Sequence, residues 1–142
     1  MSKYIFPAVF TKEDGQLYSV QFPDIEGCFT SGEGLLETFE MAEDALALVL
    51  YDMEAEGKQV PEPTKIEAIR IPKGAFTSYV TCDTKVYRRN RKMRAVKKTL
   101  TIPEWMNEEA VAAGLNFSKI LQDALFEKLE TAPVEASTNT AR

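Results

Sequence analysis

The acidic side chains of Asp14, Asp24 and Glu26 are the first candidates for catalysis, because the sequence contains no histidine. The lack of histidine excludes Ser-His-Asp and Cys-His catalysis and every zinc site that needs a histidine ligand. Carboxylates hold divalent metal ions, so a carboxylate-metal nuclease is one hypothesis. Asp14 precedes Gly15 and Asp24 follows Pro23, however, and aspartate favours turns at such positions. No third carboxylate is fixed on a predicted strand, so we expect no catalytic residue, no metal, no cofactor and no enzymatic activity.

The two cysteines, Cys28 and Cys82, are too few for a disulfide framework or a four-cysteine zinc site. We expect both to be small core residues. The N-terminus lacks the charged and apolar regions of a signal peptide, and no apolar run approaches the roughly 18 residues that span a bilayer. These features predict a reduced, cytoplasmic protein.

Charge is distributed unevenly along the 142 residues, although the net charge is only -5. Residues 1–84 carry 15 acidic and 6 basic residues, whereas residues 85–98 carry 8 basic residues and no acidic one. Residues 99–142 are mildly acidic, with 7 acidic and 3 basic residues. This pattern predicts modules with different partners, and the local basic segment is compatible with nucleic acid despite the acidic average.

Residues 1–83 predict an α+β domain with one long helix on a small, mostly antiparallel sheet. Five segments have the alternation typical of strands: Lys3 to Phe10, Leu17 to Phe22, Gly27 to Ser31, Lys65 to Ile71 and Phe76 to Cys82. Between them, apolar residues from Leu35 to Met53 recur at spacings of three and four, which predicts a helix that ends at Gly57.

The opposite face of this helix is acidic, with Glu37, Glu40, Glu43, Asp44, Asp52, Glu54 and Glu56. Two interpretations fit these residues. The helix is a core element with a solvated outer face, or the acidic face is a surface for a basic partner.

Residues 84–95 predict a basic connector that is partly helical around Tyr87. Beyond it, Val96 to Ile102 predicts a short strand, and Pro103 and Gly114 bound a helix. Asn116 is a good N-cap for a second helix, whose apolar stripe is formed by Phe117, Ile120, Leu121, Ala124, Leu125 and Leu129. Trp105 and Met106 are expected core or dimer contacts, and Thr131 to Arg142 predicts a disordered tail.

The unit at 96–130 is too small to bury a core alone, and a lone strand has two unpaired edges. Both difficulties disappear if the strands of two chains pair antiparallel and four helices pack around them. Leu100 and Ile102 would then face the shared core, while Lys97, Thr99 and Thr101 would face outward on a two-stranded ribbon. Such a ribbon fits the major groove of DNA. Asn116 would present a helix N-terminus to a phosphate of the DNA. The basic residues from Arg88 to Arg94 would add nonspecific attraction to the phosphates.

This pattern resembles the ribbon-helix-helix family of dimeric bacterial repressors. The resemblance is carried by Val96 to Pro103 (VKKTLTIP) and Gly114 to Lys119 (GLNFSK). It implies that the outward strand residues read bases and that the start of the second helix contacts phosphate through Asn116, Phe117 and Ser118. Lys98 departs from the pattern, because strand alternation places it on the inward face with Leu100 and Ile102. It must therefore lie at the end of the strand and extend into solvent. A plain dimerisation unit is the alternative.

The N-terminal part resembles the corresponding domain of HicB-type antitoxins. The matching segments are Tyr4 to Phe10 (YIFPAVF), Phe22 to Gly32 (FPDIEGCFTSG), Glu43 to Leu46 (EDAL) and Pro61 to Pro63 (PEP). The resemblance implies a type II toxin–antitoxin system, in which a truncated, inactive RNase H-like domain neutralises HicA, a small basic mRNA-cleaving ribonuclease. It also implies a C-terminal domain that binds operator DNA of its own operon.

We therefore expect a toxin-binding domain at 1–83, a basic linker at 84–95, a ribbon-helix-helix dimerisation and DNA-binding domain at 96–130, and a tail at 131–142. The predicted function is an antitoxin and homodimeric autorepressor whose toxin-contacting residues the sequence does not identify. A ligand-sensing repressor is the alternative of a different class, followed by the carboxylate-metal nuclease.

Overall fold

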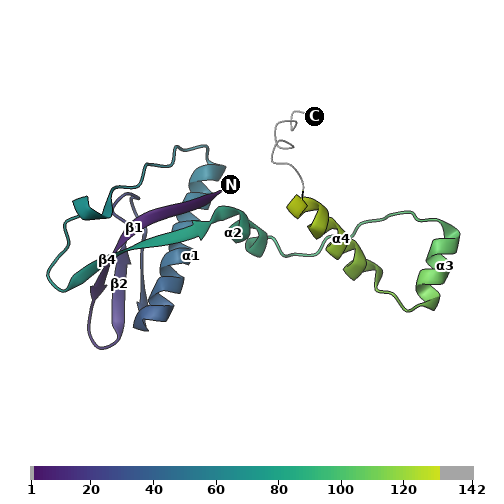
Figure 1. The fold of residues 1–142 in the computed structure, drawn as a ribbon, viewed down its shortest axis with the longest axis horizontal. Coiled ribbons are helices and arrows are strands. Elements are labelled where there is room, and N and C mark those ends of the chain that lie inside the picture. Colours follow the sequence, from purple (N-terminus) through teal and green to yellow (C-terminus); the bar gives the residue numbers. More distant parts are fainter. Residues whose placement is uncertain (1, 132–142) are drawn as a thin grey trace. The chain divides into compact units, whose positions relative to one another are not determined.

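The computed structural model describes residues 2–131, which divide into two compact units between Ala95 and Val96 (Figure 1). The first unit has α+β architecture, as predicted. Its elements are β1 (Lys3–Lys12), β2 (Leu17–Gln21), β3 (Phe29–Glu33), α1 (Gly34–Ala55), the 3₁₀ helix η1 (Ile66–Ala68), β4 (Ala75–Asp83) and α2 (Thr84–Arg91). The second unit contains α3 (Glu104–Ala112) and α4 (Phe117–Thr131). The predicted tail lies outside the described residues, except for Thr131, which ends α4.

The sheet of the first unit is antiparallel, with strand order β3-β2-β1-β4. The turn predicted at Asp14-Gly15 joins β1 to β2, and Gly15 adopts a positive φ of 63° that favours glycine. β4 pairs with β1 along the whole length of β4, from Asp83 opposite Lys3 to Ala75 opposite Thr11. β4 is therefore placed beside the first strand of the chain and forms one edge of the sheet.

The prediction of a fourth strand at Lys65 to Ile71 is wrong. Its centre forms η1, in which the Ile69 amide donates to the Ile66 carbonyl at 3.3 Å. Side chains three residues apart lie on the same side of a 3₁₀ helix. Ile66 and Ile69 are accordingly the half-buried residues of this segment. The sequence alternation there came from this spacing of three combined with Ile71, which is exposed.

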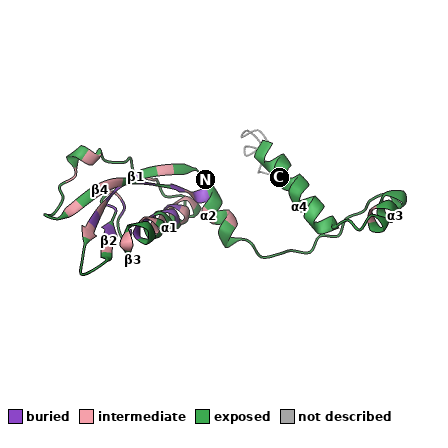
Figure 2. Cartoon of the chain, turned by 60° about the horizontal axis from the view of Figure 1, so that its bottom comes forward, coloured by how far each residue is buried: buried purple, intermediate pink, exposed green. Residues whose placement is uncertain are grey.

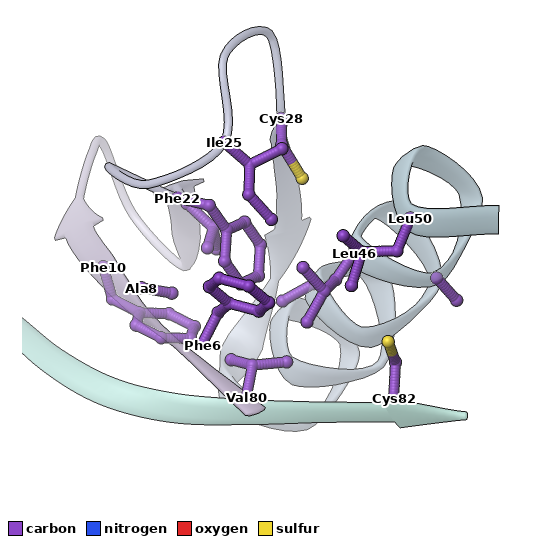
Figure 3. Close-up of a cluster of buried hydrophobic side chains, with 13 residues drawn as sticks. Phe6, Ala8, Phe10, Phe22, Ile25, Cys28, Leu46, Leu50, Val80 and Cys82 are labelled. Carbon is purple, nitrogen blue, oxygen red and sulfur yellow. The ribbon is translucent and has the colours of Figure 1, made fainter. Parts of the chain in front are cut away.

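The core lies between α1 and one face of the sheet (Figures 2 and 3). Its largest side chains are Phe6, Phe10, Phe22, Leu46 and Leu50, all almost completely buried. The spacing of four between Ala42, Leu46 and Leu50 places these three fully buried residues on one face of α1, against the strands. Cys28 and Cys82 are both free thiols within this core, as predicted.

The predicted basic connector at 84–95 is helical over most of its length. Asp83 caps α2, because its Oδ1 accepts hydrogen bonds from the amides of Lys85 at 2.9 Å and Val86 at 3.3 Å. Tyr87 packs against the core of the first unit and lies 5.6 Å from the Tyr51 ring. Only the residues after Arg91 are left without a helix before the second unit begins.

The second unit has no buried residue among positions 96–131. Val96 to Ile102 pairs with no strand among residues 2–131, so the predicted strand is not formed within this described part of the single chain. A strand is defined by hydrogen bonds to a neighbouring strand, and the described residues offer this segment no such neighbour. Among the described helices of both units, none is long and apolar enough to cross a membrane.

Candidate nucleic-acid and partner interfaces

The predicted base-reading residues Lys97, Thr99 and Thr101 are exposed on the irregular segment before α3. Between them, Leu100 is 56% exposed and Ile102 is 47% exposed. Apolar and polar side chains alternate here, as they do in a strand with one buried face and one solvated face. No described element of the second unit covers the two apolar side chains. The segment therefore has the composition of a strand with one apolar and one polar face. Its apolar side chains, Leu100 and Ile102, are nevertheless exposed to solvent.

An apolar depression of about 600 Å³ lies behind this segment in the second unit. Its lining residues come from the segment and from both helices: Lys98, Leu100, Ile102, Met106, Asn107, Ala110, Leu115, Phe117, Ser118, Ile120, Leu121 and Ala124. Several of them remain 37–56% exposed, which is far more than a core side chain keeps. The apolar residues of this unit thus form an open surface and not a closed core.

The N-terminus of α4 is capped as predicted. The Oδ1 of Asn116 accepts the Lys119 amide at 3.0 Å, and the Asn116 carbonyl accepts the Ile120 amide at 3.1 Å. The amides of Phe117 and Ser118, in the first turn, have no carbonyl acceptor within the helix. Free amides at a helix N-terminus are a common binding site for anions. The Phe117 side chain, however, lines the apolar depression. Phe117 therefore offers only its backbone to a phosphate, and its ring belongs to the hydrophobic surface.

The basic residues before the second unit fall into two groups. In α2, Arg91 donates from Nη1 to the Tyr87 hydroxyl at 3.0 Å and lies 5.6 Å from the centre of that ring. The hydrogen bond to Tyr87 raises the pKa of the Arg91 guanidinium, which is solvent-exposed and stays charged. Lys92 and Arg94 follow the helix and are exposed. The Lys92 amide caps α2 by donating to the carbonyls of Arg88 and Arg89, both at 3.1 Å, and this second group is the closest in sequence to Lys97.

Two acidic depressions lie along α1 in the first unit. One, of about 280 Å³, lies between α1 and α2 and is lined by Glu40, Glu43, Asp44, Ala47, Cys82, Asp83, Val86, Tyr87 and Asn90. The other, of about 380 Å³, is lined by Asp24, Ile25, Glu26, Val49, Asp52, Met53, Glu56, Lys58 and Pro61. The sequence revealed the acidic helix face, but the contribution of α2 and of the loop after β2 depends on the tertiary fold.

Exposed apolar residues accompany the acidic residues on α1. Met41 is 41% exposed and Leu48 is 39% exposed, at a spacing of seven that keeps them on one helix face with Asp44 between them. Protein interfaces commonly combine central apolar residues with a charged rim. This arrangement favours the interpretation of α1 as a binding surface over a purely solvated face.

The structure gives Asp24 a structural role. Its two carboxylate oxygens accept hydrogen bonds from Thr64, one from the amide at 3.0 Å and one from the hydroxyl. These bonds fasten the connector after α1 to the loop after β2. Among residues 2–131 there is no group of three acidic or cysteine side chains that would hold a metal ion. Asp14, Asp24 and Glu26 are thus not gathered into a metal centre in this part of the chain.

Burial controls the chemistry of both thiols. Desolvation raises the pKa of Cys28 to about 11. For Cys82, desolvation is again the main cause, and the negative charges of Glu43, Asp83 and Glu54 add to it, so that its pKa rises to about 12. A thiol of this kind is protonated at neutral pH and is a poor nucleophile and metal ligand.

Residues 6–122 match the family model described as the HicB_like antitoxin of bacterial toxin-antitoxin systems. The match runs from β1 into α4 and so covers elements of both units. The chain belongs to this antitoxin family. A search of curated proteins found no significant match.

A comparison with solved structures found several similar chains. A chain of the toxin-antitoxin complex from Streptococcus pneumoniae is similar with a TM-score of 0.58 and 29% identity, over 89% of this chain and 99% of that one. A chain of the HicA3 and HicB3 toxin-antitoxin complex has 28% identity and a TM-score of 0.48, over 56% of this chain and 99% of that one. The antitoxin HicB from Burkholderia pseudomallei has 22% identity and a TM-score of 0.49, over 89% of this chain and 98% of that one.

Proposed function

We propose that this antitoxin neutralises a small, basic, HicA-type mRNA-cleaving ribonuclease and represses its own operon by binding operator DNA as a homodimer. The observation that carries the proposal is the family match across residues 6–122, which includes both the acidic unit and the residues of the candidate ribbon. The similar chain from Streptococcus pneumoniae comes from a structure whose title describes a toxin-antitoxin complex. In this proposal the chain itself performs no catalysis.

The DNA-binding part of the proposal rests on the exposed apolar depression of the second unit. A second copy would cover Leu100 and Ile102 by pairing its own segment antiparallel with this one, as in a ribbon-helix-helix dimer. Lys97, Thr99 and Thr101 would then project from the outer face of the ribbon into the major groove. Lys92 and Arg94 would contribute phosphate contacts, and the first-turn amides of α4 would bind a backbone phosphate.

The toxin-binding part rests on the outer face of α1. Acidic groups at Glu40, Glu43 and Asp44 complement a basic toxin, which raises the association rate and selects against acidic partners. Met41 and Leu48 provide the apolar centre of the surface. By covering a basic face, the antitoxin would block the surface through which a ribonuclease holds its negatively charged RNA.

The test is a toxin-binding assay on matched charge reversals. Glu40→Lys with Asp44→Lys changes the net charge by the same amount as Glu13→Lys with Glu67→Lys, which alters exposed acidic residues away from α1. We expect the first pair to weaken binding of the cognate toxin at least tenfold and to restore RNA cleavage, while the second pair retains wild-type binding. Equal losses for both pairs would show that net charge alone, and not α1, attracts the toxin.

A further inference from the structure

The outer edge of β4 is long and unpaired. β4 is the last strand in the order β3-β2-β1-β4, and it pairs with β1 over nine consecutive residue pairs. On the other side of Phe76–Asp83, no backbone–backbone hydrogen bond joins the strand to any of the residues from 2 to 131. A row of free amides and carbonyls of this length is a template for another strand.

The sequence of this edge lacks the residues that usually keep strands from pairing. The 3₁₀ helix η1 contacts β4 through Tyr79, whose hydroxyl accepts the Ile66 amide at 3.4 Å, and Tyr79 points to the sheet face opposite the buried Val80 and not along the edge. Natural edges are protected by lysine, proline, a bulge or a very short strand. From Ala75 to Cys82 there is no charged residue and no proline, and Asp83 at the end is engaged in capping α2. The unbroken register with β1 excludes a bulge. The opposite edge of the sheet, β3, has only five residues and ends in Glu33. β4 is thus the edge that is suited to a partner strand.

We propose that β4 pairs antiparallel with β4 of a second copy, about a two-fold axis at Tyr79, the central residue of the strand. In this register Thr77 lies opposite Thr81 and Ser78 lies opposite Val80. Neither pair brings like charges together, and threonine pairs are favourable neighbours across strands. A strand without charge gives no preference for a basic partner, so the edge is distinct from the acidic surface of α1.

Two exposed apolar side chains support a second copy as the occupant. Phe76 stacks on Phe10 with ring centres 5.0 Å apart, which places it on the face that carries α1, yet it remains 37% exposed. At the other end of the edge, Val86 is 48% exposed and lines the same depression as Cys82. In the proposed register, Phe76 of the second copy lies opposite Cys82, which lines the same depression as Val86. The two-fold symmetry repeats this contact, so each copy covers the apolar residues of the other.

Charge patterning of the edge tests the proposal in the full chain without toxin. In Thr77→Lys/Thr81→Lys, each new lysine would face a lysine of the second copy, whereas in Thr77→Lys/Thr81→Glu each lysine would face a glutamate. We expect the first variant to sediment with half the mass of the wild type and the second to keep the wild-type mass. All three proteins, including the one with the wild-type edge, also carry Leu100→Lys/Ile102→Lys, which disrupts the proposed dimer interface of the second unit, because that interface would otherwise hold the same two chains together after the edge is broken. Equal masses for all three would overturn the proposal.

Cross-linking provides a second readout that introduces no charge into the interface. A cysteine at Tyr79 lies on the proposed axis and meets its own copy, while a cysteine at Thr81 meets Thr77. We expect a short bismaleimide to join Tyr79→Cys chains into covalent dimers and to leave Thr81→Cys largely monomeric under denaturing electrophoresis. Equal yields from the two variants would contradict the two-fold register.

Discussion

Gly32 on β3 lies against the backbone of Thr38 in α1. A β-carbon at position 32 would be 2.8 Å from both the amide nitrogen and the α-carbon of Thr38. Thr38 is itself fully buried and donates a hydrogen bond from Oγ1 to the Gly34 carbonyl at 2.6 Å. The strand and the first turn of the helix are therefore in direct backbone contact, without side chains between them.

Gly32→Ala is expected to lower the free energy of unfolding by about 1–3 kcal/mol, because the helix must shift to admit the methyl group. Urea denaturation followed by circular dichroism measures the change. Ser31→Ala, at the exposed neighbouring position, is the control and should change the stability by less than about 0.5 kcal/mol. A Gly32→Ala protein as stable as the control would show that the contact between β3 and α1 is not tight.

The buried thiols predict a loss of stability at alkaline pH. In the unfolded chain both thiols titrate near 9.0, whereas in the folded protein they titrate near 11 and 12. Above pH 9 the unfolded chain loses protons that the folded protein retains, so stability is fully present below pH 9 and falls above it. Each thiol contributes a slope of at most about 1.4 kcal/mol per pH unit.

The stability difference between pH 8 and pH 10.5 should therefore be smaller for Cys28→Ala/Cys82→Ala than for the wild type. Lysines and tyrosines also titrate in this pH range. Their effect on stability is common to both proteins, so it cancels in the comparison. An identical slope in the two proteins would mean that the thiols are accessible to water in the folded state.

Lys97→Ala is expected to weaken operator binding by about 1–3 kcal/mol and to relax specificity at one base pair in each half-site. The reason is the loss of a donor to a base edge from the outer face of the proposed ribbon. Binding is measured by titration against the promoter of the chain's own operon, with Lys128→Ala in the last turn of α4 as the control. If Lys97→Ala and Thr99→Ala both bind as the wild type does, the ribbon does not enter the groove.

Lys92→Ala/Arg94→Ala tests the phosphate contacts separately. Removing two cations per chain should lower the salt dependence of binding by about 0.9 for each lost phosphate contact, with similar losses for operator and unrelated DNA. The measurement is the slope of log affinity against log salt concentration. Arg91→Ala should have a smaller effect, because Arg91 is held by Tyr87. An unchanged slope in the double variant would place its two side chains away from DNA.

The strands and the long helix of the first unit were predictable from the sequence because each has a clear period and a clear stop. The helix from Leu35 to Met53 shows apolar spacings of three and four, and it corresponds to α1. Lys65 to Ile71 was mistaken for a strand because three isoleucines in seven residues imitate alternation. The pattern of a short segment does not distinguish a spacing of two from a spacing of three when both occur in it.

The candidate interfaces were only partly predictable. Asn116 was identifiable as a cap because its role depends on its immediate neighbours in the chain. The depression between α1 and α2 was not identifiable, because it requires Tyr87 to fold back onto Tyr51, 36 positions earlier in the sequence. Likewise, the role of Asp24 depends on Thr64, and nothing in the loop after β2 indicates that partner.

The absence of buried residues at positions 96–131 has a consequence for regulation. A unit without its own core is ordered only to the extent that it is associated, so its stability rises with the concentration of the chain. In the proposed homodimer, the amount of DNA-binding protein at low abundance grows with the square of the amount of chain. Repression would then switch on over a narrow range of antitoxin concentration, and a modest rise in antitoxin degradation would release the promoter disproportionately.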